Sequence, residues 1–216
     1  MLLVRDSMTR GVVVLSPEAT AREALVLCRE RRIRHLPVLK EGRLAGIVSD
    51  RDLRSAAPAL GDPGRASALE KIQVSDVMTR DVVSAHPDDP TEEAANKMRE
   101  RRIGCLPVVE DGTLVGILTS SDVMEALVQL MGAHEPGSRL VASMPDRPGA
   151  LAGAAGVFGV LGINIVSVVA GARQEPPPGE QGPWRAVIFR LDTINPREAT
   201  ELLEQAGYSV LWPPKP

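Results

Sequence analysis

Apolar and polar positions run in the same order twice along this chain. Residues 4–53 align without a gap with residues 74–123, an offset of 70 positions. The triplet Arg-Arg-Ile, for example, stands at both 31–33 and 101–103. This period is too long for a solenoid repeat and too short for two independent domains. We therefore expect the two units to pack face to face about a pseudo-two-fold axis, with a cleft between them.

The pattern within each unit predicts the order β-α-β-β-α. A β-branched run bounded by proline, at 11–15 and 81–85, predicts a first short strand. In the first copy Thr20 and Glu23 fit a capping box at the start of the next helix. The hairpin turns are predicted from the acidic-glycine pairs Glu41-Gly42 and Asp111-Gly112. The helix faces expected to be buried carry Ala24, Leu27 and Cys28, and in the second copy Ala94, Ala95 and Met98.

The remaining pattern completes the domain organisation. We expect a first repeat at 1–57, a polar and mobile linker at 58–73, a second repeat at 74–132 and a third domain at 138–213. The fold class is then α/β (α+β), with two βαββα repeats and a ferredoxin-like βαββαβ domain. In that last domain we predict strands at 139–144, 163–170, 184–191 and 208–212, helices to 161 and at 196–206, and a flexible Pro/Gly-rich run at 174–183.

Composition narrows the class of function. Aromatic residues make up 2% of the 216 residues and the net charge is −3, so neither a base-stacking surface nor a global electrostatic footprint for nucleic acid is present. No apolar stretch has membrane-spanning length, and no signal segment is evident. Cys28 and Cys105 fit no C-x-x-C motif, which predicts buried, reduced thiols in a cytoplasmic protein.

Each repeat carries an equivalent pair of candidate ligand-binding residues where its last strand turns into its last helix. Ser49 and Thr119 stand where a strand turns into a helix, and Asp52 and Asp122 follow three residues later. Such a corner offers helix amides to a phosphate and a carboxylate to ribose hydroxyls. The same spacing is also that of a capping box, which needs no ligand. From the residues alone both interpretations stay open.

The repeats resemble a tandem pair of CBS (cystathionine-β-synthase) domains. The resemblance rests on Val-x-Asp-x-Met-Thr at 4–9 and 74–79, on the Leu-Pro-Val segments, and on the closing Ser/Thr-x-x-Asp. It implies that clefts between the repeats bind AMP, ADP, ATP or an S-adenosyl compound. The nucleotide-binding residues it implies are Val13, Ile33, Arg34, His35, Leu36, Pro37, Ser49, Arg51, Asp52, Val83, Ile103, Gly104, Cys105, Leu106, Pro107, Thr119 and Asp122.

The two copies differ within these segments. Arg34-His35 corresponds to Gly104-Cys105, and Asp50-Arg51 corresponds to Ser120-Ser121. Guanidinium groups form charge-assisted hydrogen bonds to phosphate. We therefore predict unequal sites, with the first the better phosphate binder.

The C-terminal third resembles the ACT domain, a regulatory module that often binds amino acids. The resemblance rests on Asp-x-Pro-Gly-x-Leu at 146–151 and Gly-Ile-Asn-Ile at 162–165. It implies a tentative amino-acid site formed by Asp146, Gly149, Ala150, Leu151 and Asn164. The alternative is that Gly149 only permits the turn and that the domain only dimerises. The helix after Gly149 is rich in Ala and Gly, which predicts close packing against a sheet or a partner.

Together the domains resemble the acetoin-utilisation AcuB-like family, which implies a regulatory role in acetoin or central carbon metabolism. The leading hypothesis is a non-enzymatic nucleotide sensor, without cofactor or metal, that forms a homodimer and acts on an unidentified protein target. The alternative is a constitutive dimerisation scaffold with vestigial sites. An enzyme is disfavoured because His35, His86 and His134 fit no nucleophile-base or metal-ligand spacing and no P-loop is present.

Overall fold

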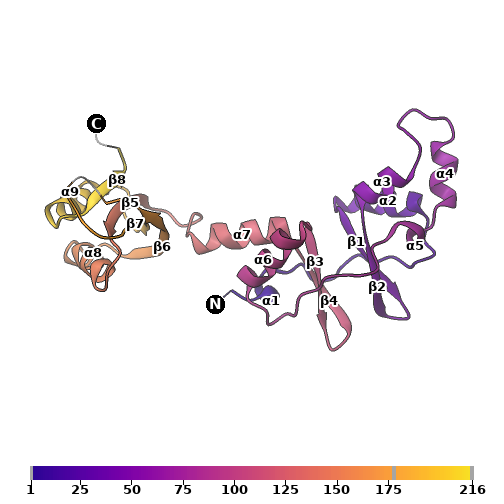
Figure 1. Cartoon of the computed structure of the whole chain (residues 1–216), viewed down its shortest axis with the longest axis horizontal. Coiled ribbons are helices and arrows are strands. Elements are labelled where there is room, and N and C mark those ends of the chain that lie inside the picture. Colours follow the sequence, from indigo (N-terminus) through magenta and orange to yellow (C-terminus); the bar gives the residue numbers. More distant parts are fainter. Residues whose placement is uncertain (1, 177–178, 215–216) are drawn as a thin grey trace. The chain divides into compact units, whose positions relative to one another are not determined.

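The computed structural model describes residues 2–176 and 179–214, and the chain divides into two compact units at 1–126 and 127–216 (Figure 1). The first unit holds both repeats. The first repeat contains α2 (Ala21–Arg31), β1 (His35–Lys40), β2 (Arg43–Ser49) and α3 (Asp50–Ala56). The second contains α6 (Thr91–Arg101), β3 (Cys105–Glu110), β4 (Thr113–Thr119) and α7 (Ser120–Leu130). These elements confirm the predicted helix, hairpin and helix of each repeat.

Local chemistry explains where these elements begin and turn. Thr20 caps α2 by accepting from the Glu23 amide, and the Glu23 carboxylate accepts from the Thr20 amide at 2.8 Å. β1 and β2 pair antiparallel across a turn in which Glu41 and Gly42 have φ of 53° and 78°. Both residues of a type I′ turn require positive φ, which an acidic-glycine pair tolerates. The predicted capping box and hairpin are thus confirmed.

The strands predicted at 11–15 and 81–85 do not form, and this part of the prediction was wrong. Leu15 makes a single parallel bridge to β1, donating to the Pro37 carbonyl at 3.0 Å and accepting from the Leu39 amide at 2.8 Å. A longer parallel ladder would need amide hydrogens on Pro37 and Pro17, which proline lacks. Ala85 repeats this isolated bridge in the second copy.

The two repeats exchange their N-terminal segments. α1 (Val4–Ser7) lies beside α6 and β4 of the second repeat, and α5 (Val74–Val77) lies beside β2 and α3 of the first (Figure 1). The Val4 amide donates to Asp89 and the Val74 amide to Ala19, at 2.9 and 2.8 Å. Val4 and Val74 are fully buried in the core of the opposite repeat. Each hydrophobic core is therefore completed by residues from the other copy.

Glycine allows these exchanged segments to approach the hairpins. A Cβ on Gly46 would lie 2.5 Å from the sulfur of Met78 and 3.0 Å from the carbonyl oxygen of Thr79. A Cβ on Gly116 would meet Met8 in the same way. The amide of Ile47 also donates to Thr79, at 2.9 Å. A larger residue at Gly46 or Gly116 would displace the segment that joins the two repeats.

The segment between the repeats contains a helix that the sequence analysis missed. α4 (Arg65–Lys71) follows Gly64, and Leu69 and Ile72 pack against the core of the first repeat. Its Glu70 forms an ion pair with Arg22 of α2. Alanine, leucine, glutamate and lysine are good helix formers, so the sequence of this segment favours a helix. The neighbouring Pro and Gly instead suggested a linker.

The second unit is a four-stranded antiparallel sheet with two helices. Its elements are β5 (Ser138–Pro145), α8 (Ala150–Val160), β6 (Ile165–Gln174), β7 (Trp184–Leu191), α9 (Arg197–Gln205) and β8 (Ser209–Trp212). The strand order is β6-β7-β5-β8, and every pairing is antiparallel. All six predicted elements are present. Residues 177–178 of the predicted Pro/Gly-rich excursion lie outside the described residues.

The core of the second unit lies between the sheet and its helices. Phe158 of α8 and Phe189 of β7 are fully buried, with ring centroids 5.0 Å apart at 68°. Gly153 of α8 leaves room for the Tyr208 ring, whose hydroxyl donates to the Ala150 carbonyl at 3.0 Å. The expected close packing of small residues is therefore confirmed at Gly153, whereas Gly156 and Gly159 face open space.

Candidate functional site

A cleft of about 500 Å³ lies between the two repeats of the first unit. One wall comes from the start of β1, the end of β2 and the start of α3. The other comes from the segment after α5 and from the start of β3. Its lining residues are Arg34, His35, Ile47, Ser49, Asp50, Arg51, Asp52, Thr79, Asp81, Val82, Val83, Arg102, Ile103, Gly104, Cys105 and Pro107.

The strand-to-helix corner at this cleft is a closed capping box. The Asp52 carboxylate accepts from the Ser49 amide at 3.0 Å and from the Ser49 hydroxyl at 2.5 Å, both at Oδ2. Thr119 and Asp122 repeat these bonds, both at 2.7 Å. The capping interpretation is therefore confirmed in both copies. It does not remove Asp52 from the cleft, since both of its side-chain bonds use one oxygen and the residue is exposed.

Three guanidinium groups and three carboxylates line the cleft. Arg34, Arg51 and Arg102 come from three separate segments and are all exposed. Among the acids, Asp50 pairs with Arg54 at 3.1 Å, and Asp52 holds the cap of α3. The three guanidinium groups equal the three carboxylates in number, and one of these carboxylates, Asp50, is also paired with Arg54 outside the cleft lining. Such a set can bind an anion by charge-assisted hydrogen bonds.

The imidazole of His35 lies where the repeats meet. A Cβ on Gly104 would be 3.2 Å from both Cε1 and Nε2 of the His35 ring. Burial lowers the pKa of His35 below its ordinary value, and Arg34 lowers it further, whereas Asp50 and Asp52 raise it. Since burial dominates, the imidazole is mainly neutral at neutral pH. It is then able both to donate and to accept a hydrogen bond.

Both cysteines are free and buried, as predicted. Burial raises the pKa of the Cys105 thiol to about 12 and that of the Cys28 thiol to about 11. Both side chains therefore stay protonated near neutral pH, although Cys105 lines the cleft. A protonated, buried thiol is a poor nucleophile.

The cleft brings together most of the residues that the sequence singled out. Seven of the predicted residues do not line it: Val13, Ile33, Leu36, Pro37, Leu106, Thr119 and Asp122. Leu36 and Leu106 are fully buried in the two cores, so they support the strands that carry the site. Sequence reasoning missed Ile47, Asp50, Asp81, Val82 and Arg102, and it did not give Thr79 a role in the site. Thr79 closes the Val-x-Asp-x-Met-Thr motif, which was the available signal.

A second, smaller groove lies in the other unit. It has a volume of about 300 Å³ and is lined by Asp146, Ala150 and Leu151 of the predicted amino-acid site, together with Val168 and Arg185. Gly149, the N-cap residue of α8, has φ of 88° and does not line the groove. Asn164 does not line it either, and its carbonyl accepts from the Asp192 amide at 2.9 Å.

Asp146 is already engaged by two arginines. Its Oδ2 accepts from Nε of Arg173 at 2.8 Å and from Arg185 at 3.2 Å. The hydrogen bond from Arg185, followed by that from Arg173, holds the pKa of Asp146 below its usual value. The groove therefore pairs an apolar wall with a carboxylate whose charge is compensated.

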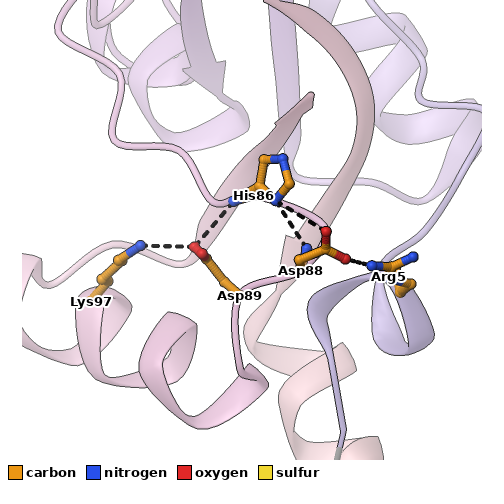
Figure 2. A network of polar contacts seen from close by, with 5 residues as sticks. All are labelled: Arg5, His86, Asp88, Asp89 and Lys97. Carbon is orange, nitrogen blue, oxygen red and sulfur yellow. Dashed lines mark hydrogen bonds and ion pairs between the residues drawn. The ribbon is translucent and has the colours of Figure 1, made fainter. Parts of the chain in front are cut away.

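A polar network outside the cleft connects the exchanged helix α1 to the second repeat. Figure 2 shows Arg5 of α1 paired with Asp88, whose amide donates to His86 at 3.2 Å. Lys97 of α6 donates to Asp89 at 2.9 Å. None of these five residues lines the cleft. Among the described residues, no group of three or more His, Cys, Asp or Glu is placed to bind a metal ion, and no helix is long and apolar enough to cross a membrane.

Comparison with known proteins gives matches for the first unit. Residues 4–59 and 74–129 each match the CBS domain family. The chain is 34% identical over 140 residues to the CBS domain-containing protein YhcV of Bacillus subtilis, covering 65% of this chain and 94% of YhcV. Some curated relatives are enzymes, among them archaeal homoserine O-acetyltransferases, of which this chain covers 23% to 25%.

Three solved structures are similar to the same part of the chain. An acetoin utilization protein (AcuB) from Vibrio cholerae is 37% identical with a TM-score of 0.54, covering 62% of this chain and 96% of that one. The CBS domain pair of MJ0100, in complex with 5′-methylthioadenosine and S-adenosylmethionine, is 30% identical with a TM-score of 0.51, covering 60% and 98%. CBSX2, in complex with AMP, is 30% identical with a TM-score of 0.52, covering 60% and 99%.

Proposed function

Because this chain belongs to the CBS domain family, we propose that it is a non-enzymatic regulatory sensor that binds an adenine nucleotide between its two repeats. The observation that carries the proposal is the cleft of about 500 Å³, in which an apolar wall, a carboxylate and three guanidinium groups converge from both repeats. Pockets for small molecules typically measure about 300–1,000 Å³ and combine an apolar lining with a few polar groups. AMP, ADP, ATP or an S-adenosyl compound is the class of ligand proposed.

Each part of the ligand has a chemical counterpart in the cleft. Val83, Ile103 and Pro107 offer an apolar surface to a purine ring. Asp52 offers a carboxylate oxygen to the ribose hydroxyls. Arg34, Arg51 and Arg102 offer donors to the phosphate. Because one cleft combines an apolar surface, a carboxylate and guanidinium donors, it is better suited to a nucleotide than to a free base or a free phosphate.

Ligand binding would act on the arrangement of the two repeats. Residues of both repeats line the cleft and the exchanged segments join the two cores, so the occupied cleft favours one arrangement of its walls. A ligand shifts such a balance only by its differential affinity for the two arrangements. Coupling of this kind typically amounts to about 1–3 kcal/mol. The readout is a partner protein or the second unit, and the similarity to AcuB supports a role in acetoin or central carbon metabolism.

The test compares two aspartates that are equivalent by sequence. Asp52→Ala and Asp122→Ala remove the same capping bonds, but only Asp52 lines the cleft. Isothermal titration with AMP, ATP and S-adenosylmethionine should therefore show a loss of affinity in Asp52→Ala, whereas Asp122→Ala retains it. Equal losses would place the site elsewhere. The absence of binding at millimolar ligand to the unmutated chain would exclude the proposed function.

The second unit is proposed to be an ACT-type domain with a ferredoxin-like fold. The βαββαβ order, the antiparallel sheet β6-β7-β5-β8 and the Asp-x-Pro-Gly turn before α8 support this assignment. Its role would be dimerisation or the sensing of an amino acid at the groove beside Asp146 and Leu151. Sedimentation velocity of the full chain with and without amino acids tests both roles, because a dimer that ignores every amino acid leaves only the first.

A constitutive dimerisation scaffold is the second candidate. The observation that favours it is that Asp52 and Asp122 already complete capping boxes without a ligand. Under this alternative the chain dimerises and binds no nucleotide at physiological millimolar concentrations. The titration above separates the two functions, since only the sensor gives saturable binding.

A further inference from the structure

His35 has no counterpart in the second repeat. It opens β1, pairs with Ser49 of β2 and lines the cleft. Its ring lies against Gly104 of the other repeat, so its position depends on both halves of the module. The residue equivalent to His35 is Cys105, which is buried. The cleft thus contains one imidazole at the junction of the repeats.

Charged groups from both repeats line the same cleft as this imidazole. On its own side, Arg34 precedes it, and α3 contributes Asp50, Asp52 and Arg51. The second repeat contributes Asp81 and Arg102 to the same cleft. The guanidinium group of Arg54 forms an ion pair with Asp50 at 3.1 Å. Asp50 and Asp52 favour the protonated ring, but burial, which favours the neutral ring, remains the larger effect.

A phosphorylated ligand would change this balance. A phosphate carries about −1.5 to −2 charges near neutral pH, with a second pKa of about 6. An anion of that charge beside the imidazole favours the protonated ring. By linkage, the ligand then binds more tightly as pH falls from the pKa of the occupied state toward the lower pKa of the empty state. An uncharged ligand produces no such change.

We propose that His35 takes up a proton when the cleft binds a phosphorylated adenosine ligand, and that it thereby favours phosphorylated over unphosphorylated ligands as pH falls. This inference rests on the proposed function, because it requires a nucleotide in the cleft. Its physical basis is the position of His35 against Gly104, within the cleft that Arg34, Arg51 and Arg102 also line. His35 is in this view a specificity-determining residue, and Cys105 cannot replace it.

The experiment is isothermal titration of the full chain with AMP and with adenosine between pH 8.0 and 6.5. Two buffers of different ionisation enthalpy at each pH give the number of protons taken up. The matched variants are His35→Gln and His86→Gln, since His86 is exposed and lies outside the cleft. Circular dichroism confirms that each variant is folded.

We expect AMP to bind severalfold more tightly at pH 6.5 than at 8.0, with proton uptake. If AMP binding raises the pKa of His35 by one unit, the affinity for AMP can rise by at most about tenfold. Adenosine should show no such trend. His35→Gln should lose the trend and His86→Gln should keep it. AMP binding by the unmutated chain without proton uptake, or the same slope in His35→Gln, overturns the inference while leaving nucleotide binding intact. If AMP, adenosine, ATP and S-adenosylmethionine all fail to bind at any pH, the proposed function itself fails.

Discussion

The exchange of segments between the repeats makes Gly46 a sensitive position for stability. Non-bonded carbon and sulfur atoms pack at about 3.5–4.0 Å, so a methyl group 2.5 Å from the sulfur of Met78 overlaps it by about 1 Å or more. The Met78 side chain can move, but the Thr79 carbonyl, at 3.0 Å, belongs to the backbone. Overpacking of this kind typically costs about 1–3 kcal/mol. We expect Gly46→Ala to lower the free energy of unfolding by that amount.

A double-mutant cycle identifies the cause of that loss. Met78→Ala removes the flexible part of the clash and leaves the Thr79 carbonyl in place. The cost of Gly46→Ala should therefore be smaller when Met78 is already alanine. Urea unfolding followed by far-ultraviolet circular dichroism measures both effects. Trp184 and Trp212 are the two tryptophans of the chain and lie in the second unit, so their fluorescence reports on that unit separately.

Two outcomes would show that Gly46 is not a tight contact between the repeats. If Gly46→Ala leaves the urea midpoint unchanged, the second repeat's N-terminal segment does not press on β2 as described. If the two substitutions are strictly additive, Met78 is not the neighbour that matters. Either outcome would contradict the close contact described between β2 and the segment at Met78 and Thr79.

Three further predictions concern single side chains. Leu36→Ala should lower the free energy of unfolding by about 2–5 kcal/mol in urea titrations, because Leu36 is fully buried. Gly156→Ala should stabilise the second unit by about 0.5–1 kcal/mol in fluorescence-detected unfolding, because a Cβ there meets no atom within 4 Å. The hydrogen bond from Arg185, followed by that from Arg173, lowers the pKa of Asp146. The charged carboxylate therefore stabilises the fold above the unfolded pKa of about 4, and this stabilisation is lost as the pH falls through the lower folded pKa. The urea midpoints of Asp146→Asn and the unmutated chain should therefore differ at pH 7 and converge below pH 4.

Much of the fold followed from the sequence because its signals were local. The capping box at Thr20 and the turn at Glu41-Gly42 each depend on residues a few positions apart, and both are confirmed. The six elements of the second unit followed from alternating runs and turn residues in the same way. Where a signal is contained in a short window, sequence reasoning can find it.

The errors arose where distant residues decide the outcome. The run at 11–15 has the composition of a strand, yet Pro37, more than twenty residues away, withholds the amide that a ladder needs. The exchange of α1 and α5 joins segments that lie in different repeats, so no window contained both partners. Helix α4 was missed because the surrounding Pro and Gly were given too much weight.

At the candidate site, too, local sequence signals identified some residues, whereas the packing of the repeats decides which of them face the cleft. The repeat itself drew attention to Asp52 and Asp122, but the sequence could not show that only Asp52 faces the cleft described here. The side chain of Leu36 is fully buried, and its predicted contact with the ligand stays a prediction. Arg102 was not among the residues predicted for the site, whereas the packing of the repeats brings it to the cleft. The predicted inequality of the two sites stays a prediction.

A crystal structure of the full chain grown with AMP would show directly whether a nucleotide binds between the repeats. We expect electron density for the nucleotide between Asp52 and Val83, with its phosphate toward Arg34, Arg51 or Arg102. Saturating AMP that leaves this cleft unoccupied, or that binds only elsewhere on the chain, would contradict this expectation.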